Sequence, residues 1–214
     1  MNVLVIGANG SIARLVEQQL IQDQKFTDVH TTMFLRDKSR VNDLLSADNS
    51  SAVEGDLDDL KVLNQAMAGQ NLIIDTTGAT RNLEYTRHII SAMQFNQVQR
   101  VISINDLGIY DEVPGAFGAW NRSMVGSGLE VGRQASDLYE NSGLSYTTLR
   151  LAWLNNENTI DYEITQKGEY FKGTTLSRKS VADVILKIVA TPEYLMNTSV
   201  GLSKPGTDGD RPQL

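Results

Sequence analysis

A chain of 214 residues is long enough for one domain with a sizeable core, and 41% hydrophobic and 21% charged residues are typical of a soluble globular protein. The net charge of −7 disfavours nucleic acid and anionic membranes as partners. The absence of cysteine excludes disulfides and thiolate chemistry, and two histidines are too few for a histidine-rich metal site. Because we find no signal-peptide core and no apolar run near the roughly 18–20 residues of a membrane helix, we expect a cytoplasmic protein.

Strand and helix patterns alternate along the chain. Apolar or β-branched runs predict strands over residues 2–6, 29–35, 52–54, 71–76, 100–104, 146–151 and 198–202. Apolar residues at helical spacing predict helices over residues 11–24, 39–45, 60–67, 81–95, 129–141 and 180–190. The remaining long segments are residues 105–128, expected to be irregular; residues 152–177, expected to be polar with short extended pieces; and a flexible tail from Pro205.

This alternation is typical of βαβ units, which build a parallel sheet covered on both faces. The predicted fold class is therefore α/β: a single-domain, Rossmann-like, doubly wound and mostly parallel sheet with helices on both faces. We find no internal repeat, linker or change in composition, so residues 1–214 are interpreted as one domain. Residues 152–177 and the C-terminal part are expected to supply the substrate-side loops.

The first predicted strand runs directly into a small-residue loop, GANGSIA, which opens the first helix. Gly7 would allow the tight turn, and Asn9 lies within it. The N–H groups of Gly10, Ser11 and Ile12 would face a pyrophosphate at the positive end of the helix dipole. The alternative is a Gly-x-x-Gly turn used for packing alone. We interpret the loop as a dinucleotide-binding site.

The end of the second strand distinguishes NAD from NADP. A carboxylate there binds a free ribose 2′-hydroxyl, whereas an arginine accommodates a 2′-phosphate. Arg36 occupies this position, and its guanidinium can form a planar, charge-assisted pair with phosphate. Arg14, just inside the first helix, would add to it. NADP(H) is therefore favoured over NAD(H); in the alternative, Arg36 is solvated and Asp37 binds the ribose hydroxyl.

Two further strand ends are expected at the same edge of the sheet. Asp56 would accept from the adenine amino group and Leu57 would pack on the ring; alternatively, Asp56 caps the next helix. The fourth strand ends in a small-residue turn that would pass beside the cofactor's riboses. Its residues are Thr76, Thr77, Gly78 and Ala79.

Several motifs in order along the chain resemble those of the atypical short-chain dehydrogenase/reductases of the NAD(P)H-binding, NmrA-like type. The resemblance covers nearly the whole chain and implies a Rossmann-like fold with a nicotinamide cofactor. A leucine, Leu151, stands where the family's "SGL-x-YT-x-LRP" stretch has proline. The motifs are VLVIGANGSIA, FLRD, EGDLDD, IDTTGA, RVISIND, NSGLSYTTLRLAWL and SRKSVADVI.

The sequence departs from the wider superfamily at the catalytic pair. That superfamily uses Tyr-x-x-x-Lys, in which the tyrosine donates a proton and the lysine lowers its pKa and holds the ribose. None of the seven tyrosines here has a lysine four residues later. Alignment through the helix before SGLSYT puts Leu129 at the tyrosine position and Arg133 at the lysine position. Arg133 is predicted to bind ribose or phosphate, but arginine cannot relay a proton.

Other polar residues follow the fifth predicted strand, near the expected nicotinamide. Ser103 matches the superfamily's strand-end serine and is a candidate to bind a substrate oxygen or the nicotinamide amide; alternatively, it is an ordinary strand serine. Tyr110 is a candidate displaced proton donor, or else a packing residue. Asn105 and Asp106 lie between them. His88, on a helix expected to face away from this edge, is interpreted as structural.

Two functions are compatible with these features. The first is an NADPH-dependent oxidoreductase that passes hydride to a small, flat acceptor such as a quinone, flavin or enone, which takes its proton from water. Trp120 and Trp153 would wall the acceptor pocket, or else pack in the core and rim. The second is a non-catalytic NADP(H)-sensing module of the NmrA-like type that signals to a protein partner. Isomerase or epimerase chemistry would require the tyrosine and lysine, and no Gly-x-Ser-x-Gly elbow supports a hydrolase.

Overall fold

The computed structural model describes residues 1–78 and 82–213. Its strands are β1 (Asn2–Ile6), β2 (His30–Leu35), β3 (Ser50–Glu54), β4 (Leu72–Asp75), β5 (Arg100–Asp106), β6 (Ser145–Leu151), β7 (Trp153–Asn155), β8 (Glu163–Thr165), β9 (Thr175–Ser177) and β10 (Thr198–Ser203). Eight strands form one sheet in the order β3-β2-β1-β4-β5-β6-β10-β8. All neighbours in it are parallel except β8, which runs antiparallel to β10. Strands β7 and β9 form a separate parallel pair.

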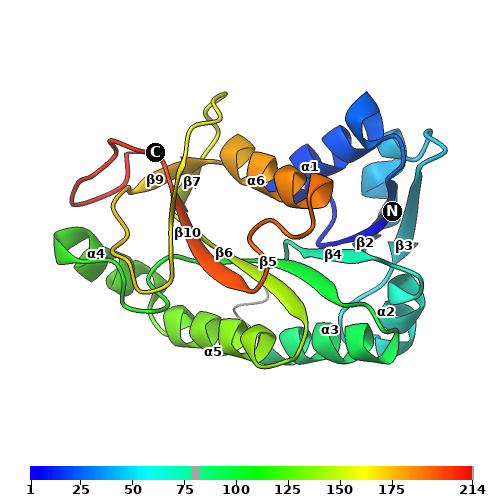
Figure 1. Ribbon diagram of the computed structural model, residues 1–214, viewed down its shortest axis with the longest axis horizontal. Helices are drawn as coiled ribbons and strands as arrows, with labels where there is room; N and C mark the ends of the chain where they lie inside the picture. The colour runs from blue at the N-terminus through cyan, green and yellow to red at the C-terminus, as the bar shows by residue number, and fades with distance from the viewer. Residues whose placement is uncertain (79–81, 214) are drawn as a thin grey trace.

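Helices cover both faces of the large sheet. They are α1 (Ser11–Gln22), α2 (Leu60–Met67), α3 (Leu83–Phe95), α4 (Gly115–Val125), α5 (Gly128–Glu140) and α6 (Arg178–Ala190), with 3₁₀ helices η1 (Gln24–Phe26) and η2 (Lys38–Leu44). Helices α1 and α6 lie on one face, and α2, α3 and α5 lie on the other (Figure 1). Within the described residues, no helix is long and apolar enough to span a membrane.

This architecture confirms the predicted fold class. The strand order β3-β2-β1-β4-β5-β6 places the first strand in the middle of the sheet, with successive strands added outward on both sides. Each parallel connection then crosses over through a helix or a helical turn, as right-handed βαβ units require. The carboxyl ends of β1 to β6 therefore meet at one edge.

The segment 105–128, which we expected to be irregular, contains helix α4. Its glycines permit close packing. A side chain at Gly118 would overlap the carbonyl oxygen of Val113, so the helix can approach that carbonyl only with glycine there. Phe117 lies one residue earlier and is buried in the core. The prediction was wrong because glycine content alone does not distinguish a loop from a closely packed helix.

The segment predicted as a helix beginning near Ser39 is the 3₁₀ helix η2. Asp37 caps it, because its carboxylate accepts from the Ser39 N–H at 3.1 Å and from the Ser39 hydroxyl at 2.6 Å. Val41 and Leu44 are the buried residues of this short element. The apolar spacing was therefore real, but it belongs to a tighter helix.

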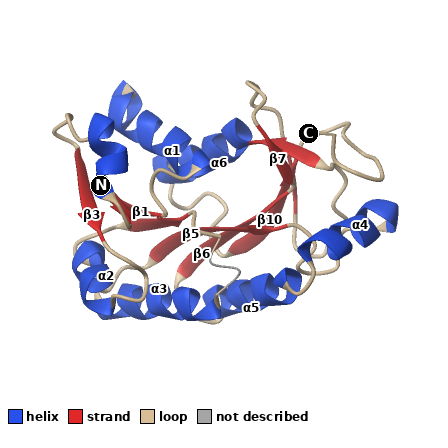
Figure 2. Cartoon of the chain, turned by 180° about the vertical axis from the view of Figure 1, so that it is seen from behind, coloured by secondary structure: helices blue, strands red, loops and turns tan. Residues whose placement is uncertain are grey.

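Part of the sheet face under α5 is polar. The face beneath α1 and α6 carries residues such as Val5, Ile102 and Leu149. Helix α5 lies over β5 and β6 on the other face (Figure 2). On that side, buried polar side chains belong to the carboxyl halves of β5 and β6. They are Ser103, Asn105, Thr148 and Arg150. Since this polar layer lies near the edge where the strand ends meet, it adjoins the candidate site.

A buried ion pair fixes the loop that follows β5. The Arg150 guanidinium pairs with the Glu112 carboxylate, and both side chains are almost fully buried. The same carboxylate accepts from the backbone N–H of Gly108 at 3.0 Å and of Tyr110 at 2.8 Å. Glu112 therefore contacts Arg150 of β6 and the backbone of Gly108 and Tyr110 at the same time. The conformation of residues 107–112 depends on these contacts.

We predict that Glu112→Ala lowers the free energy of unfolding by about 3–5 kcal/mol, because it leaves the Arg150 charge buried without a partner. The control is Arg122→Ala, which removes only an exposed pair with Asp111 and should change stability by about 1 kcal/mol or less. Urea unfolding monitored by circular dichroism measures both. Equal effects of the two variants would contradict this account.

Candidate cofactor site

A cavity of about 520 Å³ opens at the carboxyl ends of β1 to β4, within the size range of ligand pockets. Its lining residues are Ile6, Gly7, Ala8, Asn9, Gly10, Phe34, Leu35, Arg36, Asp37, Arg40, Gly55, Asp56, Leu57, Thr76, Thr77, Gly78, Asn82 and Tyr85. Nine of the predicted cofactor residues lie together here: Gly7, Asn9, Gly10, Arg36, Asp56, Leu57, Thr76, Thr77 and Gly78. A hollow of about 490 Å³ at the opposite edge is open and contains none of the predicted residues.

The glycine-rich loop approaches the end of β4 very closely. Gly7 has φ +80°, and a Cβ there would lie 2.9 Å from the Thr77 Cγ2 and 3.1 Å from the Thr77 nitrogen. Its own N–H donates to the Phe34 carbonyl at 3.1 Å, which ties the loop to β2. Only a residue without a side chain meets both requirements.

Helix α1 begins at this cavity with Gly10 as its N-cap, and no side chain caps it. A helix start of this kind presents backbone N–H groups and the positive end of the dipole. Ser11 and Ile12 were predicted to offer N–H groups to a pyrophosphate. In the structure Ser11 is exposed, and the Ile12 side chain is buried in the core. Neither lines the cavity, so any contact with a cofactor would come from their backbone.

Asn9 connects the loop to two charged residues that the sequence did not indicate. Its φ is +64°, and its backbone N–H donates to the Glu17 carboxylate. With its amide oxygen turned toward Arg40, the Asn9 side chain accepts from the guanidinium Nε at 3.1 Å and Nη2 at 3.0 Å. Asn9 therefore holds Arg40 beside the phosphate loop. Arg40 lies four residues after Arg36, in the 3₁₀ helix η2, and lines the cavity.

Two arginines and one carboxylate lie at the end of β2. Arg36 and Arg40 are exposed and both line the cavity. Asp37 also lines it, but the two hydrogen bonds from Ser39 engage its carboxylate and hold the pKa below its usual value. Arg14, expected to add to the phosphate contacts, forms an ion pair with Asp43 and does not line the cavity.

The loop after β3 lies on the far side of the cavity. Asp56 accepts from the Asp58 N–H at 3.2 Å, whereas the N-cap of α2 is Asp59. The alternative in which Asp56 caps that helix is therefore wrong. The Leu57 carbonyl lies 2.9 Å from the His88 Nδ1, so His88 contacts a residue of the cavity wall but does not itself line the cavity.

The turn after β4 is held from beneath by a buried carboxylate. Asp75 accepts from the Thr77 N–H at 3.1 Å and the Thr77 hydroxyl at 2.7 Å. The Tyr139 hydroxyl donates to the same carboxylate at 3.3 Å, and burial raises the pKa of Asp75. Thr76 donates to the Ile6 carbonyl at 3.0 Å. Ala79, the last residue predicted for this turn, lies outside the described residues.

The candidate catalytic residues belong to one row of hydroxyls, which is buried except at Tyr110, where the side chain is half-buried. The Tyr110 hydroxyl lies 2.8 Å from the Ser136 Oγ, which lies 3.4 Å from the Thr148 Oγ1. Thr148 lies 3.3 Å from the Ser103 Oγ. Lys167 lies 4.5 Å from the centre of the Tyr110 ring. Ser103 pairs in register with Asp75 of β4, Tyr110 lies at the other end of the row, and neither residue lines the cofactor cavity.

Arg133 lies apart from the cavity. Its side chain is 56% exposed on α5, and its nearest ion-pair partner is Asp137, at 3.9 Å. The structure therefore does not bring Arg133 together with the other predicted cofactor residues.

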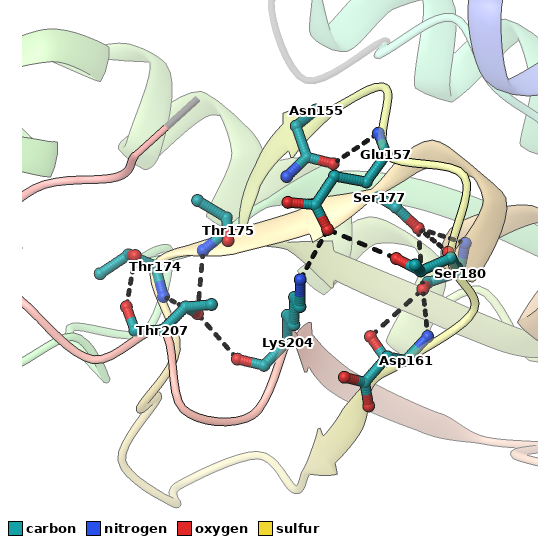
Figure 3. Close-up of polar contacts among 10 residues, drawn as sticks. Asn155, Glu157, Asp161, Thr174, Thr175, Ser177, Ser180, Lys204 and Thr207 are labelled. Atoms are coloured by element: carbon teal, nitrogen blue, oxygen red, sulfur yellow. Dashed lines mark hydrogen bonds and ion pairs between the residues drawn. The ribbon is translucent and has the colours of Figure 1, made fainter.

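The segment 152–177 and the C-terminal tail pack together beyond β6. Thr207 of the tail accepts from the Thr174 N–H at 3.1 Å, and Lys204 pairs with Glu157 at 2.6 Å (Figure 3). The expectation of a flexible tail is wrong as far as Thr207. The Trp120 and Trp153 rings pack with centroids 4.7 Å apart, joining α4 to β7.

Comparisons with known proteins support one family. Residues 7–192 match the model of a family described as NAD(P)H-binding. A Rossmann-fold NAD(P)-binding family protein from Shigella flexneri is 37% identical, with a TM-score of 0.83 over 100% of this chain and 98% of that one. The chain belongs to the NAD(P)H-binding family. This confirms the resemblance to atypical short-chain dehydrogenase/reductases.

Two other solved structures share the fold. A short-chain dehydrogenase/reductase from Veillonella parvula, in complex with NADP, is 28% identical, with a TM-score of 0.92 over 100% of this chain and 99% of that one. ChuY, an anaerobillin reductase from Escherichia coli O157:H7, is 19% identical, with a TM-score of 0.80 over 98% of this chain and 100% of that one. At this identity, ChuY shows the fold alone. No curated protein gave a significant sequence match.

We predict that Gly7→Ala weakens NAD(P)H binding at least about tenfold, equivalent to about 1.4 kcal/mol, because the new methyl group displaces the Thr77 turn. The matched control is Gly69→Ala, which has a similar φ of +74° but nothing within 4 Å of the added Cβ. The control should lose about 1–2 kcal/mol of stability from the left-handed backbone and leave the NADPH Kd unchanged. Fluorescence titration with NADPH measures binding; an unchanged Kd in Gly7→Ala would contradict the assignment.

Proposed function

We propose that this protein binds NADP(H) and passes hydride from NADPH to a flat acceptor such as a quinone, flavin or enone. The observation that carries the proposal is the cavity at the ends of β1 to β4, where a glycine cradle meets Arg36 and Arg40. Membership of the NAD(P)H-binding family supports the cofactor class, and a neighbour solved with NADP supports its phosphate.

The residues at the cavity fit a dinucleotide. Gly7 lets the loop pack directly against Thr77, and Gly7 and Gly10 line the cavity without side chains that would block a phosphate group. The uncapped start of α1 at Gly10 supplies the helix dipole on the same side. In the proposal, the pyrophosphate binds here, and Asp56 and Leu57 contact the adenine.

The charges at the end of β2 favour a 2′-phosphate over a free hydroxyl. Arg36 and Arg40 both line the cavity, and each guanidinium can donate to phosphate oxygens. The Asp37 carboxylate, the alternative partner for the ribose hydroxyl of NAD, is oriented as the cap of η2 by two hydrogen bonds from Ser39 to its Oδ1. This arrangement supports NADP(H) as the cofactor.

NADPH, when bound, supplies the hydride. The protein's own contribution is to orient the acceptor and to stabilise charge on its oxygen. We assign the acceptor contact to Ser103, which lines a small cavity with Asp75 and Asn105, with Thr148, Ser136 and Tyr110 behind it in the row of hydroxyls. Tyr110 then influences the acceptor only indirectly, through the hydroxyls of Ser136, Thr148 and Ser103. The acceptor takes its proton from water.

We predict that Arg36→Ala and Arg40→Ala each raise the Kd of NADPH by about 10- to 150-fold, the range of a lost charge-assisted hydrogen bond, while the Kd of NADH is nearly unchanged. Lys38→Ala is the control, because it removes the same charge from a neighbouring position that does not line the cavity. Isothermal titration calorimetry measures the Kd of NADPH and of NADH for each variant. Equal losses for NADPH and NADH in the arginine variants would refute the 2′-phosphate assignment.

We predict that the purified protein oxidises NADPH with at least one member of a quinone, flavin and enone panel, and that Ser103→Ala lowers kcat about tenfold or more without changing the NADPH Kd. Ser123→Ala, at an exposed position on α4, serves as control. Absorbance of NADPH at saturating cofactor measures turnover. Tight NADPH binding with no acceptor in the panel would instead favour the sensing module.

A further inference from the structure

A buried carboxylate lies directly behind the phosphate-binding loop. The Glu17 side chain on α1 is 0% exposed. Its Oε1 accepts from the Asn9 N–H at 3.1 Å, and its Oε2 lies 3.4 Å from the same nitrogen. Burying a carboxylate without a neutralising cation is unfavourable, and a leucine would fill the same position in an ordinary amphipathic helix. Glu17 therefore has a local role that apolar packing does not explain.

The charged groups around Glu17 do not neutralise it. Arg14, one turn earlier on α1, is engaged by Asp43 of η2, so these two charges largely offset each other at Glu17. Arg40 lies on the far side of Asn9 and contacts its side-chain amide. Burial, opposed by the Asn9 hydrogen bond, raises the pKa of Glu17 to about 7. Both charge states are therefore accessible near neutral pH.

We propose that Glu17 is a positioning residue of the phosphate-binding loop and that it takes up a proton when the dinucleotide binds. The inference rests on the cofactor site proposed above. An ionised Glu17 holds Asn9 in its left-handed conformation, but it also places a negative charge behind the loop that receives the anionic pyrophosphate. Protonation removes the repulsion between the two.

The loop can keep its shape through this change. A neutral carboxyl group retains a carbonyl oxygen that accepts from the Asn9 N–H. The bound cofactor also excludes water from the loop, which further disfavours the charged form of Glu17. Protonation thus changes the electrostatic potential at the phosphates while the hydrogen bond to Asn9 is maintained.

The sign of the pH dependence follows from linkage. If the bound cofactor raises the pKa of Glu17, the complex holds more protons than the free protein, and affinity is greatest below about pH 7. Above this value the Kd rises by about tenfold for each pKa unit separating free from bound protein, and then levels off. The cofactor's 2′-phosphate, with a pKa of about 6, also titrates, so only a comparison between variants isolates Glu17.

The test measures the Kd of NADPH and of NADH across about two pH units on either side of neutrality for wild type and Glu17→Gln, whose amide mimics the protonated state. We expect the two proteins to bind equally at low pH. At high pH the wild type should bind more weakly, about tenfold per pKa unit of coupling. Glu130→Gln on α5 removes an equal but exposed charge and should follow the wild type.

Calorimetry on the wild type, in two buffers of different ionisation enthalpy, provides a measurement that does not depend on folding of the variant. We expect proton uptake near neutral pH when NADH binds, because NADH has no 2′-phosphate and its proton balance reports Glu17 alone. A wild-type to Glu17→Gln affinity ratio that is independent of pH, or proton release on NADH binding, would overturn the proposal. Failure of wild type to bind either cofactor would instead overturn the proposed function.

Discussion

The close contact between the β1–α1 loop and the end of β4 determines how the candidate site is built. Gly7 lies so near Thr77 that a side chain would displace the turn, and its left-handed φ independently favours glycine. The hydrogen bond from the Gly7 N–H to the Phe34 carbonyl fixes Gly7 to β2. Because one small residue joins three strand ends, the cavity walls are set by backbone packing, and the charged side chains are added around them.

Polar residues beneath the loops support this arrangement from inside the protein. Asp75 holds the Thr77 turn from below, and Glu17 holds the Asn9 backbone. Further along the sheet, Glu112 pairs with Arg150 of β6 and accepts from two N–H groups of the loop after β5. Three buried carboxylates thus act on three different loops. Loops fixed in this way need little reorganisation when a ligand binds, which is the physical basis of a preformed site.

The sequence predicted the contributors to the cavity at the strand ends because a parallel sheet brings all its carboxyl ends to one edge. It missed Arg40, since apolar spacing does not tell which polar side chains of a short helix face a neighbouring loop, whereas in the structure Arg40 of η2 lines the cavity beside Asn9. It also missed helix α4, because glycines that permit close packing resemble those of a loop. Arg133 was placed by alignment with a motif this chain lacks, and it lies apart from the cavity.

The amino-acid sequence by itself determined the alternation of strands and helices, the glycine loop and the arginine after β2, because these depend on local spacing and on residue type. Only the tertiary structure decided which side chains meet. The pairing of Glu17 with Asn9, the row of hydroxyls from Ser103 to Tyr110 and the approach of Arg40 join residues whose contact depends on packing between elements. Such contacts leave no periodic signal in a single sequence, so spacing arguments could not have found them.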